Sequence, residues 1–237
     1  MDDQAFDTIH RPTVTRPLLG LTILAVEDSL YACDALRLMC LHSGARLRRA
    51  DCLKSARRHL QVYRPSVVIV DMGLPDGSGA ELISELSNAL PRVSVLLGIS
   101  GDSFCEDLAY AAGADGFMAK PIANLGVFQT SVLQHLPKDR QPFGLRMMRS
   151  EPICPDPVAF REDMAHMAEI LRRPMDCATI DYVTLFLRGV ARSAEDETLE
   201  TAAMDLSIAW SDGGPVEGRI TRLAQLVNAR IEDVAAI

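Results

Sequence analysis

The stretch VVIVDMGLPDGSG, residues 67–79, decides the fold of this chain. Its first four residues are apolar and β-branched, which is typical of a strand buried on both faces of a sheet. The strand stops at Asp71, and the glycines, proline and aspartate that follow predict a loop. In a parallel α/β sheet, the loops at the carboxyl ends of the strands form the crevice that binds ligands. Asp71 therefore lies where chemistry is expected.

Predicted strands and helices alternate on both sides of this stretch. Residues 21–26 form a nearly continuous apolar run, which predicts a strand ending at the acid pair Glu27 and Asp28. Further strands are predicted at 46–50, 93–99 and 116–119, and helices at 30–43, 51–63, 80–89, 103–112 and 125–136. Five repeats of strand and helix predict an α/β domain, with a parallel sheet covered by helices on both faces.

Polar residues and glycines at the predicted helix ends support these boundaries. Ser29 and Asp51 are expected to cap the first two helices, and Ser103 with Glu106 has the S-x-x-E spacing of a capping box. Gly113 supplies a left-handed stop for the helix that this box begins.

Reactive side chains follow four of the five predicted strands. Glu27 and Asp28 follow the first strand, Asp71 the third, Ser100 the fourth and Lys120 the fifth. Three carboxylates in one crevice repel each other unless a cation lies between them, and all-oxygen ligands without His or Cys favour Mg²⁺. A hydroxyl and an ammonium group are what the remaining oxygens of a phosphoryl group need. Asp71 is then the expected nucleophile.

The motifs at this edge resemble a known family. They are the acid pair in VEDS (26–29), Asp71 in VVIVDMGLPDGSG, Ser100 in LLGISG (96–101), Phe117 in DGFMAKP (115–121) and the Lys120-Pro121 pair. Because these motifs occur in this order, residues 20–137 resemble the receiver domain of bacterial two-component response regulators. The resemblance implies a flavodoxin-like sheet with strand order 2-1-3-4-5.

The resemblance also implies a role for each residue of the edge. Asp71 would accept a phosphoryl group from a cognate histidine kinase or phosphotransfer protein, and Lys120 would pair with the acyl phosphate. Glu27, Asp28, Asp71 and the main-chain carbonyl of Met72 would hold Mg²⁺.

A switch is expected from the charge that phosphorylation adds. A phosphoryl group brings about 1.5 to 2 negative charges, which draw the Ser100 hydroxyl inward. Phe117 would then rotate into the space behind Ser100, and the face formed by the last helices and strands would change with it. Gly73 and Asp102 flank the site and are expected to set how water reaches the acyl phosphate.

Composition and charge narrow the class of protein. The net charge is −8 and neither half of the chain is basic, so a surface that neutralises nucleic-acid phosphates is not expected. The six cysteines have no CxxC pair or regular spacing, which argues against a zinc site or a disulfide framework. No apolar run reaches membrane-spanning length, and the acidic start lacks signal-peptide features. We expect a cytoplasmic protein without a membrane partner.

The chain outside the predicted receiver divides into three parts. Residues 1–19 predict a flexible extension, and 138–157 a proline-containing linker. Four helices are then predicted. The first begins at a cap at Asp156, with Pro157 at its first position, and the second covers 180–191. The third runs from a capping box of Ser193 and Asp196 to Trp210, and the fourth covers 220–234. With no strand between them, residues 158–237 predict a smaller all-α bundle, self-contained or completed by a second copy.

The role of this bundle is open among three functions. The first is a protein-interaction or dimerisation domain that Asp71 phosphorylation switches, with a homodimer or a protein target as partner. The second is phosphotransfer through His166, as in histidine phosphotransfer modules. The motif of that family has Lys and Gly at the positions of Glu169 and Ile170, which argues against this function. The third is DNA binding, suggested by helix-turn-helix-like spacing over 202–223. The long turn at 212–215 and the acidic surroundings make nucleic acid an unlikely partner.

A second cluster of catalytic residues is not evident in the sequence. We therefore expect no enzyme activity beyond self-catalysed phosphoryl acceptance and hydrolysis of the acyl phosphate.

Overall fold

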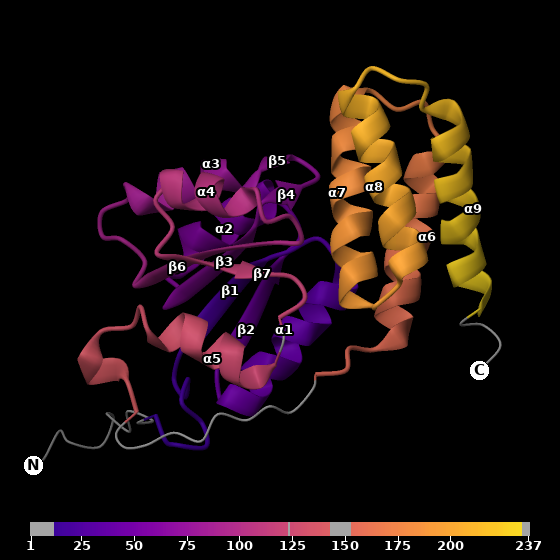
Figure 1. Ribbon diagram of the computed structural model, residues 1–237. Helices are drawn as coiled ribbons and strands as arrows, with labels where there is room; N and C mark the ends of the chain where they lie inside the picture. The colour runs from indigo at the N-terminus through magenta and orange to yellow at the C-terminus, as the bar shows by residue number, and fades with distance from the viewer. Residues whose placement is uncertain (1–11, 123, 143–152, 234–237) are drawn as a thin grey trace, which may run out of the picture.

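The computed structural model describes residues 12–122, 124–142 and 153–233. Figure 1 shows a sheet with helices on both faces and, beside it, a bundle of helices formed by the C-terminal part of the chain. No helix in the described ranges is both long and apolar enough to cross a membrane.

Five parallel strands form the main sheet. They are β1 (Thr22–Val26), β2 (Arg46–Ala50), β3 (Val67–Asp71), β6 (Val95–Ser100) and β7 (Gly116–Ala119). Their order is β2-β1-β3-β6-β7, which confirms the predicted order 2-1-3-4-5 when only these strands are counted. Directly after β3, the short strands β4 (Gly73–Leu74) and β5 (Gly77–Ser78) pair as an antiparallel hairpin.

Helices cover both faces of this sheet, as predicted. They are α1 (Leu30–Ser43), α2 (Leu53–Val62), α3 (Gly79–Ser87), α4 (Cys105–Ala111) and α5 (Leu125–Leu133), followed by a 3₁₀ turn at Lys138–Arg140. Strand β3 alternates between two apolar cores: Val67 and Ile69 pack on the face of α1 and α5, while Val68 and Val70 pack on the face of α2 and α3. The apolar run is continuous because both faces are buried.

Three predicted caps are wrong, because main-chain carbonyls or the side chain of another residue accept the amides concerned. Cys52 rather than Asp51 precedes α2, and the Asp76 carboxylate accepts from the amides of Leu53 and Lys54 at 2.8 and 3.0 Å. No side-chain hydrogen bond caps α4 at Phe104, and the Ser103–Glu106 box does not form. Asp196 alone caps α8 (Glu197–Ser211), while the Ser193 hydroxyl donates to a carbonyl of its own helix. The caps at Ser29 and Asp156 are confirmed.

Four described helices form the C-terminal bundle. They are α6 (Pro157–Leu171), α7 (Cys177–Ser193), α8 and α9 (Glu217–Asp233). Buried residues from all four share one apolar core, which includes Met167, Val183, Leu206 and Leu223. The predicted smaller all-α domain is therefore confirmed.

The bundle packs against the sheet domain. Helix α7 runs along the edge where the strands end, and α6 packs beside α1 (Figure 1). Of the predicted extension, residues 1–11 lie outside the described residues, and Leu18 is fully buried in the sheet domain. Residues 143–152 of the predicted linker and 234–237 of the last helix also lie outside the described residues. The domain boundaries at 19, 137 and 157 stay predictions.

Candidate functional site

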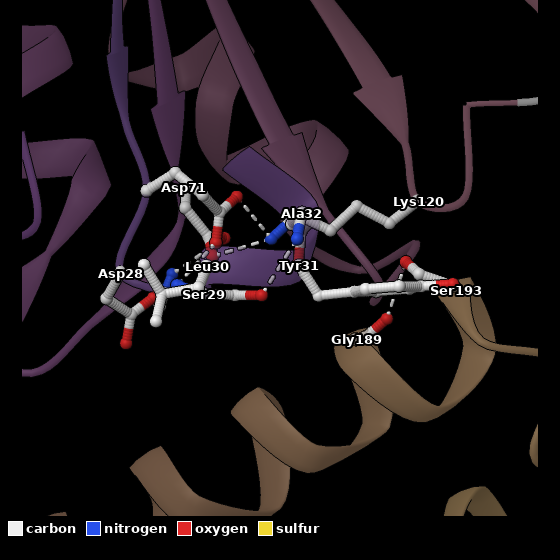
Figure 2. A network of polar contacts seen from close by, with 12 residues as sticks. Asp28, Ser29, Leu30, Tyr31, Ala32, Asp71, Lys120, Gly189 and Ser193 are labelled. Carbon is white, nitrogen blue, oxygen red and sulfur yellow. Dashed lines mark hydrogen bonds and ion pairs between the residues drawn. The ribbon is translucent and has the colours of Figure 1, made fainter. Parts of the chain in front are cut away.

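The ends of β1, β3 and β7 bring two carboxylates and an ammonium group together. Lys120 Nζ lies 2.8 Å from Asp71 Oδ2 and 2.7 Å from Glu27 Oε2. All three residues are buried, and Figure 2 shows Lys120 extended toward Asp71. Burial by itself lowers the pKa of Lys120, but the charges of Asp71 and Glu27 outweigh it and raise that pKa. Lys120 is therefore a fixed positive charge at the centre of the site.

The acid pair completes a cluster that fits a divalent cation. One carboxylate oxygen from each of Glu27, Asp28 and Asp71 lies within 4.8 Å of the others. Asp28 Oδ1 is buried and has no hydrogen-bond partner among the residues that the structure describes. An orphaned carboxylate oxygen beside two other carboxylates is what an Mg²⁺ ligand set requires. The residues present therefore fit Mg²⁺.

The acid pair also has perturbed protonation equilibria. Burial, and next the charges of Asp71 and Asp28, raise the pKa of Glu27 against the opposing effect of Lys120. Burial and the charge of Asp71 raise the pKa of Asp28 from 3.8 to about 7. A bound cation would reverse both effects, because it favours the ionised carboxylates.

The remaining predicted site residues lie around this cluster. The Met72 carbonyl accepts the amide of Gly79 at 3.1 Å, which leaves one of its lone pairs free for a cation. Ser100 is buried at the end of β6, and its hydroxyl accepts the amide of Asp102 at 3.1 Å. Phe117 is half-buried on β7. The structure thus brings the predicted set to one edge, while the role of each residue stays a prediction.

Helix α7 covers this edge. The Tyr182 hydroxyl donates to Asp28 Oδ2 at 2.6 Å, and Leu185 and Phe186 line the same small cavity as Asp71 and Lys120. Burial, and next the charge of Asp28, raise the pKa of Tyr182, so this hydroxyl remains a donor. Sequence reasoning did not identify these α7 residues as part of the site.

Two arginines of α7 hold the loop that follows β6. Arg188 Nη1 donates to Asp102 Oδ2 at 3.1 Å, and Arg192 Nη1 donates to the Gly101 carbonyl at 2.6 Å. Asp102, which is expected to set how water reaches the acyl phosphate, is therefore bound to the bundle. A sequence signal for this face exists, since Phe186 belongs to the apolar stripe that faces the bundle core and Tyr182 packs against that core.

A second contact joins α6 to the start of α1. The buried Asp163 carboxylate accepts from the Ser29 hydroxyl at 2.7 Å and from the amides of Leu30 and Tyr31 at 2.8 and 3.1 Å. Figure 2 shows Ser29 and Leu30 next to Asp28. A negative charge suits the N-terminus of a helix, where amide groups lack partners. The signal in the sequence that could have identified this contact is the position of Asp163 among the apolar residues of the buried face of α6.

The residues of the two alternative outputs lie elsewhere. His166 is exposed on α6 and is not among the described residues that line the Asp71 cavity. In the region of helix-turn-helix-like spacing, Ala203, Leu206 and Leu223 are buried in the bundle core. Neither alternative output is tested by this placement.

Comparisons with known proteins agree with the geometry of this edge. Residues 23–130 match the response regulator receiver domain family. The KDP operon transcriptional regulatory protein KdpE of Escherichia coli K12 is 30% identical over 99 residues, covering 42% of this chain and 44% of KdpE. The transcriptional regulatory protein PhoP of the same organism is 28% identical over 102 residues, covering 43% and 46%. The chain thus spans under half the length of these relatives.

Solved structures similar to this chain carry related descriptions. A putative response regulator from Chloroflexus aurantiacus is 26% identical, with a TM-score of 0.41 over 43% of this chain and 86% of that one. The chemotaxis response regulator CheY4 of Vibrio cholerae is 21% identical, with a TM-score of 0.45 over 49% and 98%.

Residues 23–130 are a receiver domain of the two-component response regulator class. The family match ends before α6, so the bundle lies beyond it. Both curated relatives are named as transcriptional regulatory proteins, so the comparisons do not support the expectation that nucleic acid is an unlikely partner.

Proposed function

We propose that this protein is a response regulator that accepts a phosphoryl group on Asp71 and signals through its helical bundle. The observation that carries the proposal is the buried contact of Asp71 with Lys120, beside the acidic cluster of Glu27 and Asp28. The donor is a cognate histidine kinase or phosphotransfer protein. We propose no other catalytic activity than this acceptance and the hydrolysis of the acyl phosphate.

The proposed reaction follows from the groups at the edge. An Asp71 carboxylate oxygen attacks phosphorus, a P–O bond forms, the P–N bond to the donor imidazole breaks, and that imidazole keeps the electron pair and takes a proton from water. Glu27, Asp28, Asp71 and the Met72 carbonyl would hold Mg²⁺, which supplies positive charge for the phosphoryl oxygens. Lys120 neutralises a further oxygen, because phosphoryl transfer depends on positioning and charge.

The proposed switch uses residues next to the acceptor. The Ser100 hydroxyl turns from the Asp102 amide toward the new oxygens, and Phe117 follows into the space behind it. The bundle then presents a surface to a protein target or to a second copy of the chain.

Phosphorylation of the protein of residues 1–237 by acetyl phosphate tests this proposal. Phosphate-affinity gels and mass spectrometry are expected to show one Mg²⁺-dependent phosphoryl group on Asp71, and Asp71→Asn is expected to remove it. Asp107→Asn, an exposed carboxylate on α4, is the matched control and keeps the label. An acyl phosphate on another residue of Asp71→Asn would contradict the assignment.

A further inference from the structure

The proposed acceptor site is closed in this structure. Asp71 and Lys120 are each only 7% exposed, and the cavity between them and α7 has a volume of about 10 Å³. That is about the space that one water molecule needs. A phosphoryl group with its three terminal oxygens does not fit, and a donor imidazole cannot reach the Asp71 carboxylate past Leu185 and Phe186.

The two surfaces that meet here have complementary shapes. A Cβ atom on Gly73 would lie 2.1 Å from Leu185 Cδ2, and one on Gly101 would lie 2.9 Å from the Cα of Gly189 on α7. At Gly73 the nearest atoms belong to the Leu185 side chain, whereas at Gly101 they belong to the backbone of α7. The backbone of α7 therefore reaches residue 101 only because that residue is a glycine. The contact therefore depends on glycines from both domains.

Polar contacts hold α7 in this place. The Tyr182 hydroxyl occupies one oxygen of Asp28, while Arg188 and Arg192 bind Asp102 and the Gly101 carbonyl on the loop that follows Ser100. All three contacts involve residues next to the acceptor, rather than a remote part of the receiver. A change at the metal ligands or at the loop after Ser100 must therefore disturb the docking of α7.

We infer that α7 is an intramolecular lid on the acceptor site, and that phosphorylation and lid closure exclude each other. The inference rests on the proposed function of Asp71. In the closed state, α7 excludes the donor, and the Tyr182 hydroxyl donates to Asp28 Oδ2, which leaves less negative charge on Asp28 to attract a cation. Once the lid is open and Asp71 is phosphorylated, the phosphoryl group fills the space under Leu185 and Phe186, so α7 cannot return. The released face of α7, with Tyr182, Leu185 and Phe186, then becomes available.

A disulfide that locks the lid tests this inference. A Cβ on Gly73 would lie 3.7 Å from the Cβ of Leu185, within the usual range for a disulfide. The Gly73→Cys/Leu185→Cys variant of residues 1–237, with the exposed Cys154 and Cys177 changed to Ser, is treated with acetyl phosphate and Mg²⁺ before and after reduction. We expect the oxidised form to be phosphorylated at least about ten-fold more slowly than the reduced form, because the disulfide leaves few molecules with an open lid.

The outcomes separate the two proposals. Equal labelling of the oxidised and reduced forms would overturn the lid and leave Asp71 as acceptor. If none of the reduced double variant, the wild type and Leu185→Ala carries a label on Asp71, the proposed function is overturned, and the lid with it. If only the reduced double variant fails to react, Leu185→Ala decides: faster labelling than in the wild type supports the lid, and an unchanged rate refutes it.

Cation binding supplies a readout that needs no phosphoryl transfer. Calorimetric titration with Mg²⁺ is expected to show about ten-fold tighter binding to Tyr182→Phe than to the wild type, because the variant removes one hydrogen bond to a carboxylate. Tyr110→Phe, an exposed tyrosine on α4, is the matched control and should bind like the wild type. An unchanged Mg²⁺ affinity of Tyr182→Phe would count against this effect of Tyr182 on Asp28.

Discussion

At the scale of single residues, three buried carboxyls give the protein an unusual dependence on pH. Burial raises the pKa values of Glu27, Asp28 and Asp163 above those of exposed carboxyls. A carboxyl whose pKa is higher in the folded state binds more protons when folded. Its contribution to stability is therefore greatest at low pH and is lost as the pH rises toward the folded-state pKa.

For Asp28, this loss falls between pH 3.8 and about 7. Without Mg²⁺, we expect the free energy of unfolding to fall with pH in this window, by up to about 1.4 kcal/mol per pH unit for each proton involved. Asp28→Asn should flatten the slope, since its amide does not titrate. Urea unfolding at pH 5, 6 and 7 measures this, with Asp34→Asn as a control on α1. An unchanged slope in Asp28→Asn would be inconsistent with the raised pKa.

Asp163 should contribute strongly to stability, because its buried carboxylate accepts three hydrogen bonds from the start of α1. Asp163→Ala leaves the Ser29 hydroxyl and the amides of Leu30 and Tyr31 without their acceptor, at an expected cost of about 2–3 kcal/mol. The neighbouring exposed Glu162→Ala should cost under about 0.5 kcal/mol. Chemical unfolding of both variants measures the difference, and equal stabilities would disprove the role of Asp163.

At the scale of elements, the N-terminus of α8 shows how one carboxylate serves two helices. Asp196 accepts the Leu199 amide at 3.0 Å and also binds Arg230 of α9 through both oxygens, at 2.7 and 3.1 Å. Asp196→Ala should therefore destabilise the bundle by about 2 kcal/mol, more than the loss of a cap alone. Arg230→Ala should cost less, because the cap remains. Thermal unfolding of the two variants tests this order, and the reverse order would contradict it.

The elements that sequence reasoning placed correctly are those whose signal is local. Strand 67–71 is rich in β-branched residues, as is typical of a strand buried on both faces. Strands 46–50 and 116–119 also have their predicted bounds. The cap of α2 was wrong, because the acceptor for its first amides, Asp76, comes from the loop after β3. The edge of the site was predictable, since parallel strands end together. The residues of α7 that close it were not, because their place depends on how two domains pack.

At the scale of the whole molecule, the docking of α7 should couple the unfolding of the two domains. Leu185→Asp places a charge against Gly73 and the acidic cluster and should undock the bundle. Differential scanning calorimetry should then resolve two transitions, separated by about 5 °C or more, where the wild type shows one. Leu41→Asp, at an exposed position on α1, should keep a single transition. A single transition in Leu185→Asp would argue against this coupling.

The carboxylate that completes the first turn of α1 belongs to α6, more than a hundred residues along the chain. A receiver cut off after residue 142 contains the sheet and its five helices, but it lacks the acceptor for two amides next to the acid pair. We expect water to take the place of Asp163 there, with Ser29 alone capping the helix. An excised receiver will therefore hold Glu27 and Asp28 less rigidly than the intact protein does. Any rate or affinity measured on the fragment will describe the fragment only.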